Sequence, residues 1–195
     1  MKELLYSIYN VFLNLWNCLL LKRKKVRYGK TLKINGRLRL HGNGTMTIGD
    51  NVRINSCESA NPIGGMEHTV ISMRNNAPLT IGHNVGMSNV AIFCHKRITI
   101  EDNVFLGGGV KIYDTDFHSL DYSLRGKGID IDVPVSKSIV IKSNAFIGAH
   151  SLILKGVTIG KYSIIGAGSV VTKNIPDNEI WAGNPAHFIR KGDVK

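Results

Sequence analysis

The sequence predicts an all-β solenoid, a prism of stacked three-strand coils that follows one N-terminal amphipathic helix. Three observations carry this prediction. Aliphatic residues recur every six positions over long stretches after residue 30, the first twenty residues follow a helical period, and the six-residue period is lost between Phe117 and Ile139. Repeats of this kind stack one small unit on the next and bury a continuous core along the axis.

The composition is that of a folded globular protein with a basic surplus. The chain has 195 residues, of which 43% are hydrophobic and 20% charged, and its formal net charge is +11. Such a charge favours a polyanionic partner, for example nucleic acid, an anionic membrane surface or a phosphorylated ligand. Cys18, Cys57 and Cys94 form no paired spacing. This argues against a disulfide framework or a zinc site and favours a reducing compartment.

The N-terminal segment is predicted to be a helix. Its polar residues recur every three or four positions and form one stripe: Glu3, Ser7, Asn10, Asn14 and Asn17. Apolar residues cover the remaining surface: Leu4, Leu5, Ile8, Phe12, Leu15, Trp16 and Leu19. The apolar residues are not continuous over the ~18 positions that a membrane span needs. Glu3 and the lack of a small-residue cleavage site argue against a secretory signal.

A basic run at residues 21–27 follows this helix and leaves two interpretations of it. The helix can dock on the body of the protein or on a neighbouring subunit and shield the open end of the solenoid, as apolar helix faces usually do. Alternatively, it lies in a membrane interface with its basic residues facing anionic lipid: Lys22, Arg23, Lys24 and Lys25. We favour docking and keep weak peripheral membrane contact through residues 1–27 as the alternative.

The solenoid pattern is clearest after residue 140. Aliphatic residues follow one another at intervals of six: Ile141, Ile147, Ile153, Ile159, Ile165 and Val171. The residue four places after each is mostly small: Ala145, Ser151, Val157, Ser163 and Ser169. The same period appears earlier, from Ile48, Ile81 and Ile100. This pattern suits short strands around a narrow prism, with Gly or Asn-Val pairs at its corners.

The interruption of the period predicts a loop at residues 118–138 that leaves the prism. Long loops on a rigid scaffold commonly carry binding and catalysis. His118 lies at the root of this loop, where the last strand before it ends. Because an imidazole can take a proton from an attacking hydroxyl near neutral pH, His118 is the acid–base candidate.

The C-terminal segment is expected to close the prism. Trp181 is predicted to pack the closing turn, and Asn184-Pro185 is predicted to begin a short helix, since proline suits the first helical turn. Such a tail would cover the strand edges of the last coil. The predicted organisation is a helix and basic linker over 1–29, the solenoid over 30–180 and a cap over 181–195.

Four motifs resemble the hexapeptide-repeat acyltransferases, and the resemblance covers roughly residues 30–191. They are DTDFHS (114–119), FIGAHSLILKGVTIG (146–160), IGAGSVVTKNIP (165–176) and WAGNPAHFIRK (181–191). The nearest likeness is to sugar O-acetyltransferases of surface-polysaccharide biosynthesis and to galactoside and maltose acetyltransferases. The resemblance implies a left-handed parallel β-helix and a homotrimer with its sites at subunit interfaces. It also implies transfer of an acetyl group from acetyl-CoA to a sugar or glycan hydroxyl, without a metal. We expect a cytoplasmic location, and the alternative is a peripheral position on the inner face of the cell membrane.

The resemblance also assigns residues on the acceptor side. It implies that His118 is a general base that activates the acceptor hydroxyl for direct attack on the thioester, without an acyl-enzyme. Asp114 and Asp116 either orient the imidazole or hydrogen-bond the hydroxyls of the acceptor, and the alternative is that they serve as turn residues. Arg125 is either an acceptor contact or a solvated loop charge.

Two acceptor contacts of the family are replaced in this chain. An asparagine and an aspartate that touch the acceptor in the galactoside enzymes correspond here to Met87 and His95. Asn89 is the nearest polar substitute. The identity of the acceptor and of its modified hydroxyl therefore cannot be carried over.

On the acetyl-CoA side, pantetheine in the family runs along a groove between two subunits, where backbone groups of small residues bind its amides. The implied contacts are Phe146, Ala149, Ala167, Thr172, Lys173, His187 and Arg190. Phe146 and His187 replace a tryptophan and an arginine of the galactoside enzymes, and Arg190 suits the adenosine phosphates. For Ala167 and Thr172, ordinary packing of the repeat is the alternative.

Other activities on the same fold stay open. They are an N-acetyltransferase of an amino-sugar nucleotide, an antibiotic acetyltransferase and a non-catalytic scaffold. A zinc site like that of the carbonic anhydrases on this fold would need a histidine five residues beyond His118, where the chain has Ser123. We discount nucleic acid, because the basic residues at 22–39 accompany no recognition helix, aromatic-lined sheet or zinc-finger pattern.

Overall fold

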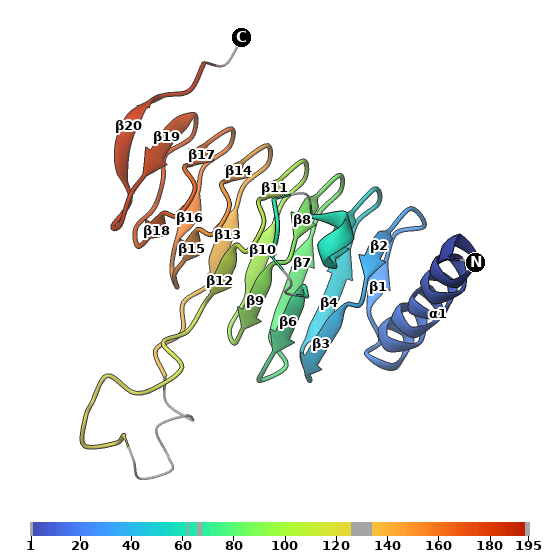
Figure 1. Ribbon diagram of the computed structural model, residues 1–195. Coiled ribbons are helices and arrows are strands. Elements are labelled where there is room, and N and C mark those ends of the chain that lie inside the picture. Colours follow the sequence, from blue (N-terminus) through green and yellow to red (C-terminus); the bar gives the residue numbers. More distant parts are fainter. Residues whose placement is uncertain (1, 62, 66–67, 126–133, 194–195) are drawn as a thin grey trace.

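The protein is a left-handed parallel β-helix with one helix at its N-terminal end (Figure 1). The computed structural model describes residues 2–61, 63–65, 68–125 and 134–193. In the N-terminal helix the side chains are described at Tyr9 and from Val11 onward. Three parallel sheets form the sides of a prism around one hydrophobic core. This architecture confirms the solenoid predicted from the six-residue period.

Each sheet takes one strand from every coil. Sheet A contains β1 (Arg27–Tyr28), β4 (Thr45–Ile48), β7 (Pro78–Ile81), β10 (Ile98–Ile100), β13 (Ile139–Ile141) and β16 (Thr158–Ile159). Sheet B contains β2 (Lys33–Gly36), β5 (Arg53–Ser56), β8 (Gly86–Ser88), β11 (Phe105–Leu106), β14 (Phe146–Ile147), β17 (Ile164–Ile165), β19 (Glu179–Ala182) and β20 (His187–Lys191). Sheet C contains β3 (Arg39–Gly42), β6 (Val70–Met73), β9 (Ala91–Cys94), β12 (Lys111–Tyr113), β15 (Leu152–Ile153) and β18 (Val170–Val171).

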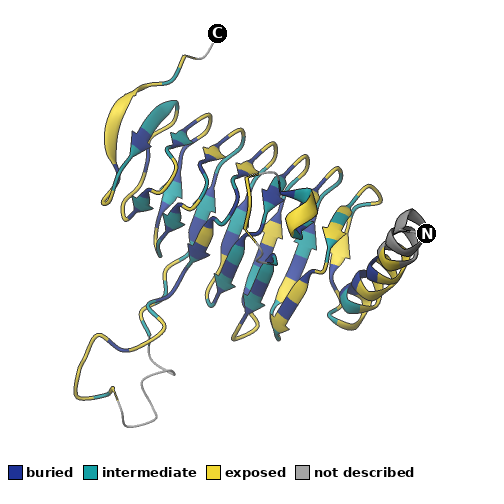
Figure 2. Ribbon diagram, in the orientation of Figure 1, coloured by how far each residue is buried: buried dark blue, intermediate teal, exposed yellow. Residues whose placement is uncertain are grey.

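The repeat residues form the core that the sequence predicts. In each sheet the inward aliphatic residue of one coil lies in register with that of the next, as Ile100, Ile141 and Ile159 do in sheet A. All of the six-spaced residues are buried, and so are the small residues between them (Figure 2). The buried serines pair their hydroxyls with backbone carbonyls, for example Ser151 with Gly166 at 3.0 Å. Small polar residues are therefore tolerated inside the prism.

The corners use the predicted asparagines. Asn51, Asn84, Asn103 and Asn144 have φ between 56° and 63°, the left-handed region that asparagine tolerates better than most residues. The side chains also form a ladder from coil to coil, because Asn51 donates to Asn84 at 3.1 Å and Asn84 donates to Asn103 at 2.9 Å. The corner between sheets A and B is thereby fixed by both backbone and side chains.

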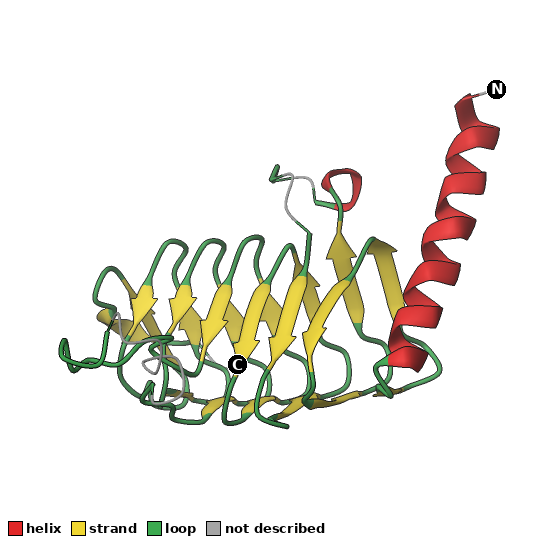
Figure 3. Cartoon of the chain, turned by 90° about the horizontal axis from the view of Figure 1, so that it is seen from below, coloured by secondary structure: helices red, strands yellow, loops and turns green. Residues whose placement is uncertain are grey.

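Helix α1 (Lys2–Arg23) docks on the first coil through a narrow face (Figure 3). Leu13, Asn17 and Leu21 are buried there. The Asn17 amide donates to the Gly36 carbonyl at 2.9 Å and accepts from the Leu38 amide at 3.1 Å. None of the helices in the described residues is both long and apolar enough to cross a membrane.

The expected short C-terminal helix is wrong. Residues 187–191 form β20, which pairs antiparallel with β19. A strand satisfies the backbone groups that β19 would otherwise leave open at the end of sheet B, and a helix could not do so. Trp181 is buried at the end of the core, in register with Ile165, so its predicted packing role is confirmed.

Two segments leave the prism. One joins β12 to β13 and is the interruption predicted after Phe117. The other, residues 57–69, joins β5 to β6 and contains the 3-10 helix η1 (Glu58–Ala60). This second insertion was not predicted, although a Pro-X-Gly-Gly cluster at 62–65 breaks the period there.

Candidate active site

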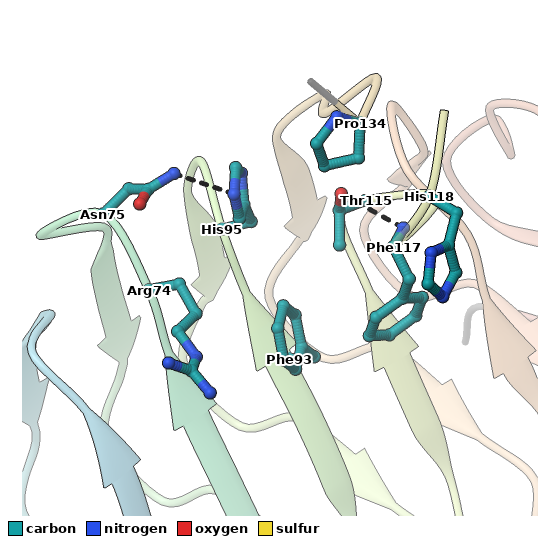
Figure 4. A pocket seen from close by; sticks show the side chains of 8 residues that line it. All are labelled: Arg74, Asn75, Phe93, His95, Thr115, Phe117, His118 and Pro134. Carbon is teal, nitrogen blue, oxygen red and sulfur yellow. Dashed lines mark hydrogen bonds between the residues drawn. The ribbon is translucent and has the colours of Figure 1, made fainter. Parts of the chain in front are cut away.

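The predicted loop leaves the prism at the corner between sheets C and A, where a pocket of about 360 Å³ opens (Figure 4). The pocket is lined by residues that follow β6, by residues on or after β9, and by both ends of the loop: Arg74, Asn75, Phe93, His95, Thr115, Phe117, His118 and Pro134. Because these segments come from successive coils, the stacking of the solenoid brings distant parts of the sequence together. His118 is the only predicted site residue in this lining.

An aromatic cluster at the root of the loop positions His118. Phe117 has φ of 65°, which is unusual for an aromatic residue. Its ring centroid lies 4.7 Å from that of Phe93 and 5.2 Å from that of Tyr113. Figure 4 shows the His118 imidazole beside the Phe117 ring. Strained backbone of this kind persists where packing holds it, often at functional sites.

Asp114 is a buried support of the pocket wall. Its carboxylate accepts hydrogen bonds from the backbone N–H groups of His95, Lys96 and Arg97 at 2.7–2.9 Å. Burial, and secondarily the charge of Asp114, raise the pKa of the neighbouring Cys94 thiol to about 12. This geometry favours the turn-residue interpretation of Asp114 over direct acceptor binding.

Asp116 anchors the loop to the following coil. One carboxylate oxygen pairs with the Lys155 ammonium, and the other is buried without a hydrogen-bond partner among the described residues. The Asp116 backbone N–H donates to the Val135 carbonyl at 3.2 Å, which ties the two ends of the loop together. Asp116 is thus placed to hold the loop.

A polar network forms the opposite wall of the pocket. The Asn75 amide lies 2.7 Å from Nε2 of His95, and Ser136 Oγ lies 3.0 Å from its Nδ1. Ser136 Oγ in turn donates to Thr115 Oγ1 at 3.0 Å. Both ring nitrogens of His95 are therefore engaged. Apart from His95, the members of this network were not predicted, since they are ordinary polar residues that follow different strands.

Like Asp114 and Asp116, the other two predicted acceptor contacts lie outside the pocket lining. The Arg125 guanidinium donates to the carbonyls of Ser119 and Leu120 at 3.0 and 3.3 Å, so it braces the loop. Asn89 is buried at the corner between sheets B and C, where its amide donates to the Gly65 carbonyl at 3.1 Å. Asn89 and His118 therefore stand at different corners of the same chain.

The small residues predicted to bind pantetheine also lie at the corner between sheets B and C. The corner is tightly stacked, because a Cβ on Gly148 would meet the Ala167 amide at 2.5 Å. Gly168 donates to the Ala149 carbonyl at 2.8 Å, whereas the Ala167 carbonyl accepts no hydrogen bond from the described residues. Ala167 is exposed, so its backbone is accessible at the surface of this corner.

The remaining predicted acetyl-CoA contacts lie in two places, on sheet B and at the corner between sheets C and A. Phe146 is exposed on sheet B beside Phe105, its neighbour in register, and His187 and Arg190 lie on β20 of the same sheet. Arg190 forms an ion pair with Asp193 at 2.9 Å. Thr172 and Lys173 lie instead after β18, at the corner between sheets C and A, with the Lys173 ammonium 5.1 Å from the Trp181 ring.

Grouped metal ligands are not found in the described part of the chain, where no three His, Cys, Asp or Glu residues are placed to hold an ion. That the protein needs no metal stays a prediction.

Comparison with known proteins agrees with the repeat and the fold. Residues 138–173 match the family described as bacterial transferase hexapeptide (six repeats). A putative acetyltransferase of Schizosaccharomyces pombe is 47% identical over 94 residues, 48% of this chain and 43% of the relative. The galactoside O-acetyltransferase of Escherichia coli is 41% identical over 103 residues, 53% of this chain and 48% of the relative. The matches thus span about half the length of these relatives.

A solved structure extends the likeness over most of the fold. A point mutant of the N-acyltransferase AntD from Bacillus cereus, in complex with dTDP and coenzyme A, superposes with a TM-score of 0.72 over 88% of each chain at 23% identity. The chain therefore carries the hexapeptide repeat and the left-handed β-helix fold of the hexapeptide-repeat acyltransferases, as its motifs indicate.

Proposed function

We propose that the protein transfers an acetyl group from acetyl-CoA to a hydroxyl of a sugar or glycan precursor, with His118 as the general base. The observation that carries this proposal is the position of His118 in the corner pocket. The preceding residue, Phe117, is held there by the contact of its ring with Phe93. The 41% identity to a galactoside O-acetyltransferase supports the acetyl donor and the hydroxyl acceptor.

In the proposed reaction the imidazole of His118 takes the proton of the acceptor hydroxyl as its oxygen attacks the thioester carbon. The carbon–sulfur bond breaks, and the proton passes from the imidazole to the departing sulfur, which gives an acetyl ester and free coenzyme A. A positioned base typically contributes ~10²–10⁴ to the rate. Arg74 and Asn75 lie across the pocket, where they can bind other hydroxyls of the acceptor.

We further propose that a complete site needs two subunits of a homotrimer. Ala149 and Ala167 lie on one side of sheet C and His118 on the other. The outer face of sheet C presents two pairs of half-buried apolar residues that suit a subunit contact, Val70 with Ala91 and Leu152 with Val170, and the exposed Lys111 lies in register between the two pairs. Cyclic packing on this face would bring the acetyl-CoA corner of one subunit to the loop of its neighbour.

The proposed setting is the cytoplasm, because the unpaired cysteines suit a reducing compartment. The direct test is release of free thiol from acetyl-CoA with a panel of sugars. Each sugar is offered beside its amino-sugar analogue and beside a deoxy-sugar that lacks the candidate hydroxyl. Mass spectrometry should find an acetyl ester on a sugar hydroxyl. Acetylation of the amine alone, or no transfer to any member of the panel, would contradict the proposal.

A further inference from the structure

Helix α1 turns an apolar face away from the protein. Side chains on the side opposite the docking face are strongly exposed, including Phe12 (61%), Leu15 (60%) and Leu19 (66%). Val11 and Trp16 flank them and are exposed as well. Leucine and phenylalanine normally lie on the buried side of a surface helix. We propose that this outward face binds the surface of an anionic lipid membrane.

The docking face of helix α1 includes a polar residue of the kind that usually faces solvent. Asn17 belongs to the polar stripe, yet it is buried against the first coil and makes two hydrogen bonds to it. The helix is thus held to the prism partly through polar contacts, which leaves most of its apolar surface uncovered. An orientation of this kind is unfavourable in water alone and favourable against an apolar phase.

The positive charge of the chain is concentrated at the same end. Between Leu4 and Gly49 there are nine Lys and Arg residues and no Asp or Glu. Residues 50–195 hold fifteen basic and thirteen acidic residues, so they are close to neutral. Lys22 and Arg23 occupy the last turn of α1, and no side chain from residue 22 to residue 39 forms an ion pair with the described residues.

This charge pattern favours an anionic lipid surface over a second copy of the chain as the partner that covers the exposed face of α1. Packing two α1 faces together would bring two clusters of like charge into contact, which opposes association. A membrane that contains anionic lipid would neutralise the same cluster and accept the apolar side chains. Amphipathic helices with Lys or Arg beside an apolar face bind membranes in this way, with the face ~5–10 Å deep in the interface.

The position of the helix is compatible with this role. Helix α1 lies at the end of the prism, beside the first coil, and its axis runs across that end (Figures 1 and 3). The pocket of His118 lies at the corner of later coils, at residues after β6, β9 and β12. The helix can therefore lie flat in the membrane interface while the pocket stays open to water.

The test is flotation of the full chain with phosphatidylcholine vesicles, with and without phosphatidylglycerol, at low and high salt. The wild-type protein should float with the anionic vesicles at low salt and much less at high salt. The double variant Leu15→Glu/Leu19→Glu should bind at least about tenfold more weakly. Lys22→Gln/Lys25→Gln should weaken binding by roughly fivefold for each charge removed.

Matched controls separate this surface from general changes of charge or hydrophobicity. Ile63→Glu removes an apolar side chain of equal exposure (60%) from another part of the molecule, and Lys161→Gln/Lys191→Gln removes two distant charges. Both controls should float like the wild type. The proposal is overturned if the wild-type chain ignores anionic vesicles or if the Leu15/Leu19 variant binds equally. It is also overturned if light scattering without lipid shows that the wild-type chain forms an assembly and that Leu15→Glu/Leu19→Glu dissociates it. A second copy of the chain would then cover the apolar face of α1.

Discussion

The two corners that flank sheet C have the same repeat but are held in different ways. At the corner between sheets B and C, the fifth and sixth coils turn within a few residues, and glycines such as Gly148 stack too closely for a side chain. At the corner between sheets C and A, the fourth coil opens into the long loop after β12. Asp114, Asp116 and Ser136 hold that opening by hydrogen bonds and an ion pair.

The difference shows how one scaffold can serve two chemical tasks. At the fifth and sixth coils, close stacking leaves backbone groups near the surface of this corner, which suits an extended ligand such as pantetheine. The opened corner gathers titratable and polar side chains around a pocket, which suits proton transfer. We therefore expect substitutions at the opened corner to change turnover and substitutions on the sheet B side to change the KM for acetyl-CoA.

The largest effect is expected from His118→Ala. If the imidazole accepts the acceptor proton, turnover should fall by ~10²–10⁴ while the KM for acetyl-CoA stays nearly unchanged. Steady-state kinetics with both substrates varied would measure this. A His118→Ala enzyme with near-normal turnover would remove the loop from the chemistry.

Asp114→Ala should destabilise the opened corner. The change leaves three backbone N–H groups without their charged acceptor, and we expect a loss of about 3 kcal/mol in the free energy of unfolding. Asp121→Ala is the matched control, because Asp121 is an exposed carboxylate of the same loop that accepts one backbone hydrogen bond, from Ser123 at 2.8 Å, and its loss should change stability much less. Urea denaturation monitored by circular dichroism compares the two. Equal stability of both variants would show that Asp114 does not support the corner.

The regular part of this fold could be predicted from sequence because each coil repeats the same local rule. An aliphatic residue every six positions and Asn or Gly at corners fix the core, as Ile141 and Asn144 illustrate. The ends do not repeat, so they were harder to predict. The C-terminal helix expected at Asn184-Pro185 is a strand, because pairing with an open sheet edge outweighs the local preference of proline.

Arg190→Ala should have a smaller effect, on the donor side only. Loss of one phosphate contact should raise the KM for acetyl-CoA by roughly threefold to tenfold and change turnover at saturation less. The expected change is modest because Arg190 already pairs with the exposed Asp193. Asp193→Ala is the companion variant and should not raise this KM. If Arg190→Ala lowered turnover alone, the residue would belong to the acceptor side.

The candidate site was only partly predictable for a similar reason. His118 stands out because it follows the last repeat residue before a long interruption. The wall made by Asn75, His95 and Ser136 has no local pattern, since the three residues meet only after successive coils stack. Arg74 was missed in the same way.

The smallest expected effect concerns the thiols. Burial raises the pKa of Cys94 to about 12, so this thiol stays protonated and shielded at pH 8, whereas Cys18 is exposed on α1. A maleimide should label Cys18 in the native protein and leave Cys94 unmodified, which peptide mass spectrometry can check. Rapid labelling of Cys94 in the native protein would indicate that the opened corner is loosely packed.

The central claim is that one site combines the opened corner of one subunit with the close-stacked corner of its neighbour. Complementation tests it most directly. Ala167→Trp should block the acetyl-CoA corner and His118→Ala should remove the base, so each homotrimer should be inactive. Co-expression of the two variants should restore about a quarter of the wild-type activity, because each mixed trimer then holds one intact site. If the mixed preparation stays as inactive as its parents although mass spectrometry shows that mixed trimers form, the two corners do not share a site and the account is wrong.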